Sequence, residues 1–119
     1  MVSGRAPMEI LFATRKLQKA CQDEKSLRRT WGAAGPIVGR RLTELAAFEL
    51  LAHVPTTPPW RRHQLKGDRE RQFAVNVGKS LRLVFEVADD PIPRDDHGGI
   101  DLTRVTAIRI REVTDYHGD

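Results

Sequence analysis

The chain is 119 residues long, with 39% hydrophobic and 30% charged residues, a balance typical of one globular domain around a single core. No apolar run approaches the length of a membrane span, and the single cysteine, Cys21, excludes an internal disulfide and a cysteine-cluster zinc site. Lysine and arginine total 20 against 16 acidic residues, so the net charge of +4 is compatible with a polyanionic partner without establishing one.

The N-terminal end combines a predicted leader with a predicted strand. Residues 1–7 are expected to be a loose leader, and they lack the basic and apolar pattern of a secretory signal peptide, so we expect a cytoplasmic protein. The apolar run at residues 8–12 predicts an edge strand, which opens a single domain spanning residues 8–119.

Helical signals follow this strand. Thr14 is a suitable N-cap, and the apolar residues after it recur at helical spacing until Asp23, which predicts a helix that breaks or restarts there and ends before Gly32. Pro36 fits the first turn of a second helix. That helix is expected to end at the prolines that begin with Pro55, because proline removes a backbone donor and clashes with the preceding turn.

The period then changes from helical spacing to alternation. Residues 73–77 and 81–87 alternate in polarity around a turn at Gly78, which predicts a β-hairpin. Residues 88–101 are rich in proline, glycine and acidic residues and predict a long solvated loop. The run of β-branched residues at 105–113 predicts the final strand.

These elements predict an α+β fold in which two N-terminal helices pack on one face of a mainly antiparallel β-sheet. The apolar face is predicted to consist of Phe73, Val75, Val77, Leu81, Leu83, Phe85, Ile108 and Ile110. The opposite face is predicted to be open and basic, and it carries Asn76, Arg82, Glu86, Arg109 and Arg111. A basic sheet face is a natural surface for an RNA phosphate chain, but antiparallel sheets also commonly expose one polar face to water alone.

A carboxylate, a phenol and an imidazole stand side by side after the final strand, at Asp115, Tyr116 and His117. A strand holds its last side chains at defined positions, as catalysis requires. Histidine exchanges protons near neutral pH, and tyrosine donates a hydrogen bond or stacks on a base. The alternative is three polar residues at a frayed terminus, and the triplet alone leaves both interpretations open.

Two further motifs accompany this triplet. Residues 63–67, His-Gln-Leu-Lys-Gly, precede the hairpin, and Arg82 lies in its second strand. Residues 10–17, Ile-Leu-Phe-Ala-Thr-Arg-Lys-Leu, open the domain. In this order, the motifs and the elements between them resemble the HigB branch of the RelE/ParE toxin superfamily over residues 8–117.

The resemblance implies a toxin of a type II toxin–antitoxin system with a RelE-like fold. Such a toxin cuts mRNA in the ribosomal A site and is neutralised by a small helix-turn-helix antitoxin, similar to HigA. The implied partners are therefore the antitoxin, the ribosome and mRNA, with no membrane. The positions that match the family's active site are His63, Asp115, Tyr116 and His117, and those that match its phosphate contacts are Lys66 and Arg82. The acidic loop at residues 88–101 is longer than in the most compact members of the family. It is therefore expected to obstruct or redirect contacts with the ribosome and so to affect the mode of cleavage.

These residue types suit cleavage of RNA by its own 2′-hydroxyl, which leaves a 2′,3′-cyclic phosphate and a 5′-hydroxyl. His63 and His117 are expected to transfer protons, with the choice of base and acid left open. Asp115 is expected to orient a histidine or to act as base, and Tyr116 to stack on or hydrogen-bond to the substrate. The two matched basic residues are expected to neutralise the phosphate. No metal or cofactor is required.

Rival interpretations use the same residues or the same fold. His63, Asp115 and His117 offer mixed nitrogen and oxygen ligands for a metal ion, although no closely spaced histidine pair supports such a site. A ParE-like toxin would inhibit DNA gyrase without catalysis, and a degenerate member would only bind its antitoxin. His53 and His97 lack motif context and are expected at the surface.

Overall fold

The computed structural model of the chain describes residues 7–69 and 71–115. Its helices and strands follow one another in the order β1 (Glu9–Phe12), α1 (Arg15–Ala20), α2 (Glu24–Trp31), α3 (Gly35–Ala47), β2 (His63–Gln64), β3 (Gln72–Val77), β4 (Leu81–Val87) and β5 (Ala107–Asp115). Short 3₁₀ turns complete the fold: η1 (Gly32–Ala34), η2 (Leu51–His53), η3 (Gly67–Arg69) and η4 (Leu102–Arg104). Among the described residues, no helix is long and apolar enough to cross a membrane.

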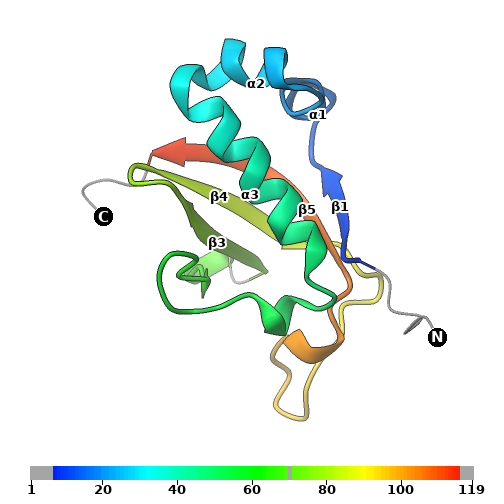
Figure 1. Cartoon of the computed structure of the whole chain (residues 1–119). Helices are drawn as coiled ribbons and strands as arrows, with labels where there is room; N and C mark the ends of the chain where they lie inside the picture. Colours follow the sequence, from blue (N-terminus) through cyan, green and yellow to red (C-terminus); the bar gives the residue numbers. More distant parts are fainter. Residues whose placement is uncertain (1–6, 70, 116–119) are drawn as a thin grey trace, which may run out of the picture.

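The strands form one five-stranded mixed sheet, and the α-helices lie on one side of it (Figure 1). The strand order is β1-β5-β4-β3-β2, so the first strand of the chain pairs with the last. β1 is parallel to β5, and every other pair is antiparallel. The α+β class, the edge strand and the hairpin are confirmed, while the final strand continues beyond residue 113 to Asp115.

The first predicted helix is divided where its second cap occurs. The side chain of Thr14 accepts a hydrogen bond from the N–H of Leu17 at 3.1 Å, and the carboxylate of Asp23 accepts one from the N–H of Ser26 at 2.8 Å. Each cap satisfies a backbone donor that a helix start leaves unpaired. α1 and α2 are therefore two short helices, which confirms the predicted break.

α3 begins as predicted but ends earlier, at Ala47. The N–H of Met8, just before β1, donates to the carbonyl oxygens of Ala46 and Phe48 at 3.1 and 3.0 Å. Phe48 has extended backbone angles, so the helix cannot continue through it. The prediction that the helix extends to the prolines is wrong, because a tertiary contact with β1 ends it first.

The hydrophobic core lies between α3 and the sheet. Val38 and Leu45 of α3 are fully buried, and Phe73 of β3 stacks on Phe85 of β4 with ring centroids 6.0 Å apart. All eight residues predicted for the apolar face belong to this core or pack against it. The alternation in the sequence therefore identified the buried face, as expected where one face of a sheet must be shielded from water.

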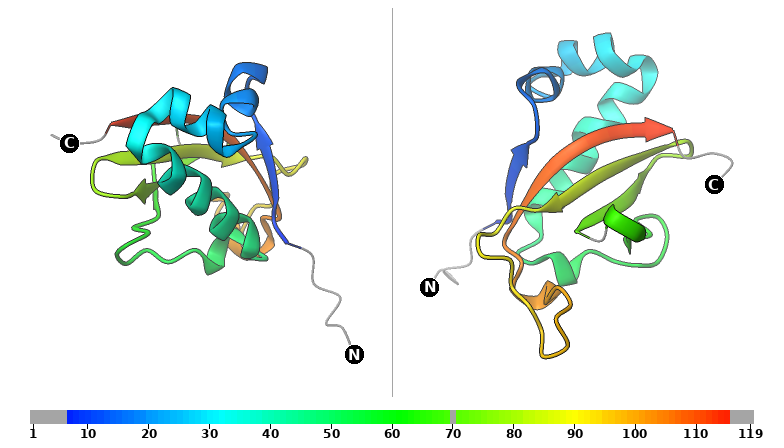
Figure 2. Two further views of the ribbon diagram at one scale, coloured as in Figure 1. Left: turned by 45° about the horizontal axis from the view of Figure 1, so that its top comes forward. Right: turned by 180° about the vertical axis from the view of Figure 1, so that it is seen from behind.

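The centre of the opposite face is covered. Ala74 and Val84 are cross-strand neighbours on it, since they alternate with the buried apolar residues, yet both are 0% exposed. The chain between β2 and β3, including η3, folds over this region (Figure 2). From η3, Arg69 reaches Glu112 of β5, with its guanidinium 3.4 Å from the carboxylate. The prediction of an open basic face is therefore wrong for its centre, and two separate hollows remain at its ends.

The acidic segment at residues 88–101 is a long and mostly exposed loop, which confirms the prediction, and two sets of contacts anchor it to the domain. The carboxylate of Asp89 accepts hydrogen bonds from the N–H groups of Thr106 and Ala107 at 3.1 and 3.0 Å, and from the Thr106 hydroxyl at 2.7 Å. Ile92 and Ile100 pack against the core. The Asp89 carboxylate thus fixes the loop to the start of β5, and the two isoleucines fix it to the core.

Candidate functional site

A groove of about 820 Å³ opens beside β2, at one end of the face opposite the helices. The residues that line it come from the segment before β2, from β2, from the turn after it, and from β3 and β4: Thr56, Arg61, Arg62, His63, Lys66, Asn76 and Arg82. The structure therefore brings together three residues that the sequence singled out, namely His63, Lys66 and Arg82.

His63 presents an exposed side chain at the start of β2. Its backbone is paired with Ala74 of β3, and its ring Nδ1 lies 3.0 Å from the carbonyl oxygen of Arg61. Because a carbonyl oxygen only accepts hydrogen bonds, Nδ1 carries the hydrogen, and the neutral ring has its lone pair at Nε2. His63 is thus oriented to accept a proton at Nε2 when neutral and to donate one there when charged.

The carbonyl that orients His63 belongs to a constrained loop. Arg61 has a φ of 51°, in the left-handed region that residues with a Cβ rarely occupy. Its N–H donates to the carbonyl of Thr57 at 2.9 Å, while Nε of Arg62 donates to the carbonyl of Val54 at 2.8 Å. Burial lowers the pKa of Arg62, but an arginine remains charged at neutral pH. These bonds hold the strained residue in place, so the orientation of the imidazole is built into the loop.

Trp60 anchors the same loop from the inside. Its ring meets that of Phe48 edge-on, with centroids 5.3 Å apart, and the guanidinium carbon of Arg41 lies 4.5 Å from the ring centroid. Its carbonyl accepts a hydrogen bond from the N–H of Asn76 on β3 at 2.8 Å. A buried aromatic ring with a cation on its face is a strong packing element. The loop is therefore fixed to both α3 and β3.

The remaining lining residues make the groove cationic. Lys66 is exposed, and Arg82 is partly buried on β4 between Asn76 of β3 and Thr114 of β5. None of the described residues that line the groove carries a carboxylate. Concave walls of low dielectric concentrate a potential of one sign, so the groove attracts anions.

The C-terminal triplet is described only at its first residue. Asp115 ends β5, has an exposed side chain and pairs with Leu81. Because Leu81 belongs to the helix-covered face, alternation places Asp115 on that side and Thr114 on the groove side. Asp115 is not among the residues that line the groove. Tyr116 and His117 lie outside the described residues, so their roles stay predictions.

Among the described residues, the other reactive side chains do not line the groove. His53 and His97 are exposed, as expected. In the part of the chain that the structure describes, no three His, Cys, Asp or Glu side chains are grouped so that they could hold a metal ion. Burial raises the pKa of the Cys21 thiol to about 11, so little thiolate forms at neutral pH.

Three features of the groove have no counterpart in the sequence predictions. The carbonyl of Arg61 orients His63, but a backbone group gives no signal through residue type. Thr56 lines the groove from a proline-rich stretch that predicted only the end of a helix. The positive φ at Arg61 also had no signal, since glycine or asparagine normally marks such positions.

No family model, curated protein or solved structure matches the chain.

Proposed function

We propose that the chain is a metal-independent endoribonuclease, a toxin of the type II toxin–antitoxin kind that cuts mRNA on the ribosome. The observation that carries this proposal is the groove, where His63, Lys66 and Arg82 meet from separate parts of the chain. An oriented imidazole among cations suits the cleavage of a polyanion by proton transfer. A protein that only blocked gyrase or only bound an antitoxin would not need this combination.

The proposed reaction uses the nucleophile that RNA carries. Nε2 of neutral His63 takes the proton of the 2′-hydroxyl, whose oxygen then attacks the adjacent phosphorus. Lys66 and Arg82 stabilise the negative charge that develops on the phosphorane. The 5′-oxygen leaves with a proton from an acid, for which the sequence offers His117. The products are a 2′,3′-cyclic phosphate and a 5′-hydroxyl, and the reverse assignment of the two histidines gives the same products.

The proposed partners follow from the same motifs. The ribosome would hold the mRNA so that its 2′-hydroxyl is aligned with the leaving oxygen, because the groove itself is wide and open to solvent. A helix-turn-helix antitoxin would neutralise the toxin, and both would act in the cytoplasm.

A map of transcript ends before and after induction tests this proposal. The wild-type chain should create new 5′ ends within translated reading frames, while His63→Ala should create none. His97→Ala removes an exposed histidine outside the groove and serves as the matched control. His117→Ala should likewise abolish toxicity while antitoxin binding persists. Growth arrest without new transcript ends would refute the proposal and favour a gyrase inhibitor.

A further inference from the structure

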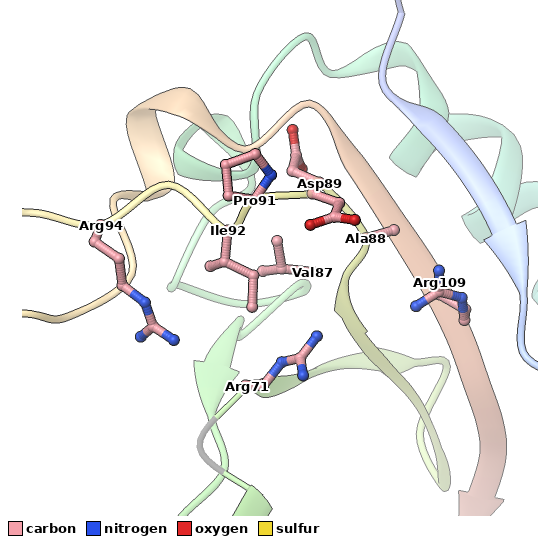
Figure 3. Close-up of a pocket in the computed structure, with 9 residues that line it drawn as sticks. Arg71, Val87, Ala88, Asp89, Pro91, Ile92, Arg94 and Arg109 are labelled. Atoms are coloured by element: carbon pink, nitrogen blue, oxygen red, sulfur yellow. The ribbon is translucent and has the colours of Figure 1, made fainter.

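A second hollow, of about 560 Å³, lies at the other end of the same sheet face. Figure 3 shows the side chains that line it. Three arginines surround it: Arg71 from the chain that follows η3, Arg94 from the acidic segment, and Arg109 from β5. Because these positions lie far apart in the sequence, the fold is what creates the cluster.

Two carboxylates around this hollow are already engaged by the protein. Asp89 accepts its hydrogen bonds from the backbone at the start of β5. Glu86, beside the hollow on β4, lies 2.9 Å from the guanidinium of Arg109. These two carboxylates therefore support the structure around the hollow and do not take part in binding a ligand.

The other charged side chains of the hollow are exposed. Arg71 and Arg94 are both exposed, and no ion pair joins either of them to a described residue. Arg94 donates one hydrogen bond, from Nη1 to the carbonyl of Gly98 at 3.1 Å, which leaves further donors on its guanidinium. Asp90 is also exposed, so two arginines and one aspartate remain for a ligand.

The hollow and the groove lie on one face and share their building elements. The chain between β2 and β3 supplies Lys66 to the groove and Arg71 to the hollow. On β4, Arg82 and Glu86 point to the same side, since they are an even number of residues apart, and they are separated by about 13 Å. Arg69, whose side chain is 41% exposed, lies between the two sites, because it reaches Glu112, the strand partner of Val84, midway between Arg82 and Glu86 on β4.

We propose that the hollow is a second phosphate-binding subsite, which receives the backbone of the RNA strand whose scissile phosphate lies in the groove. This inference rests on the proposed function. It adds the path of the RNA strand across the protein, which runs from the groove over Arg69 to the hollow. The distance of about 13 Å along β4, from Arg82 in the groove to Glu86 beside the hollow, corresponds to the rise of about four stacked nucleotides. Arg71 and Arg94 contact the phosphate, and Arg109 shapes the wall from its pair with Glu86.

Equilibrium binding of 2′-O-methyl RNA tests the subsite, because this RNA lacks the nucleophile and cannot be cut. Two lengths are compared at low ionic strength by fluorescence anisotropy, one of about three nucleotides and one of about ten. The double variant Arg71→Ala/Arg94→Ala should bind the longer RNA about tenfold more weakly, and the slope of its salt dependence should fall by about 0.7 for each phosphate that is no longer neutralised. Its affinity for the shorter RNA should not change.

Controls separate charge from fold and RNA from free phosphate. Arg29→Ala removes an exposed arginine from α2, on the helix side, and should not alter either affinity. Arg71→Lys/Arg94→Lys should restore most of the loss. Inorganic phosphate alone, followed by thermal unfolding, should stabilise the wild type only slightly more than the Arg71→Ala/Arg94→Ala variant, because a single phosphate lacks the neighbouring contacts of a bound strand.

Each remaining outcome overturns the subsite. Normal affinity of the Arg71→Ala/Arg94→Ala variant for the longer RNA, with weakened binding by Lys66→Ala, would remove the subsite and leave the groove assignment standing. Failure of the wild type to bind either length of RNA would refute both the subsite and the assignment of the groove. Phosphate stabilisation that is lost in the Arg71→Ala/Arg94→Ala variant, without any length dependence for RNA, would assign the hollow to a free anion.

Discussion

The groove and the second hollow occupy opposite ends of one sheet face, but their charges are arranged differently. The described residues that line the groove include Arg61, Lys66 and Arg82 and no carboxylate. The hollow mixes its arginines with Asp89 and Asp90. A hollow lined by cations of one sign attracts an anionic ligand, whereas a hollow that mixes both signs also supports the structure around it.

The two sites also differ in what holds their key side chain. In the groove, the carbonyl of Arg61 orients His63 and leaves Nε2 for chemistry. In the hollow, the Asp89 carboxylate accepts hydrogen bonds from the backbone at the start of β5. The first site is thus arranged for proton transfer, and the second combines structural support with binding. The following substitutions test this division.

The largest expected effect is on cleavage by His63→Ala. Loss of a general acid or base lowers a rate by about 10²–10⁴-fold, and the variant should retain its fold because His63 is exposed. The measurement is the rate of mRNA cleavage by purified protein on programmed ribosomes, with His97→Ala as control. A rate within a fewfold of wild type would contradict the role of the imidazole.

Asp89→Ala tests the structural role of the hollow's carboxylate. The substitution removes the acceptor for Thr106 and Ala107, so the free energy of unfolding should fall by about 1–3 kcal/mol. Asp90→Ala is the matched control, because this neighbouring aspartate is exposed, and its effect should stay within about 0.5 kcal/mol. Urea unfolding measures both. Equal losses of unfolding free energy at the two positions would show that the hydrogen bonds of Asp89 do not stabilise the fold.

Lys66→Ala should separate binding from chemistry in the groove. Loss of one cation at the phosphate should weaken the binding of uncleavable RNA about tenfold, similarly for all sequences, and should reduce its salt dependence. Lys16→Ala on α1, an exposed lysine on the helix side, should leave binding unchanged. Identical losses in the two variants would mean that RNA responds only to the net charge of the protein.

The smallest expected effect is a local response of the acidic segment to pH. The Thr103 hydroxyl and the Arg104 guanidinium lower the pKa of Asp101 from its ordinary value. A carboxyl whose pKa is lowered on folding stabilises the fold above its unfolded pKa of ~3.9, and this stabilisation is lost as the pH falls through the folded value. The contacts around Arg104 should therefore persist from neutral pH to about 5 and weaken below about 4.

An NMR titration of the Thr103 amide checks this expectation. The amide donates to Asp101 at 3.0 Å, so its chemical shift should follow that carboxyl, with a midpoint below the value of a free aspartate. Asp101→Asn should abolish the transition. A midpoint at or above the ordinary value would contradict the bonded geometry.

The sequence predicted what depends on local patterns. Alternation at residues 73–77 and 81–87 identified the buried face, while the cap at Thr14 and the break in the apolar pattern at Asp23 identified two helix starts. These signals succeed because burial and capping act within a few residues of the chain. The order of short motifs likewise identified His63, Lys66 and Arg82, which the fold brings to one groove.

What the sequence did not predict depends on contacts between distant segments. α3 ends where the N–H of Met8 reaches its last carbonyls, and η3 covers the centre of the sheet face through Arg69. The register of β5 against Leu81 places Asp115 on the helix side, which no local pattern indicates. The orientation of His63 depends on a backbone carbonyl and is equally invisible in residue types.

The chemistry of the cut ends tests the central claim most directly. We predict that mRNA cut by the wild-type protein on programmed ribosomes carries a 5′-hydroxyl on one fragment and a 2′,3′-cyclic phosphate on the other, and that His63→Ala yields neither. Fragments with 5′-phosphate and 3′-hydroxyl ends would contradict it.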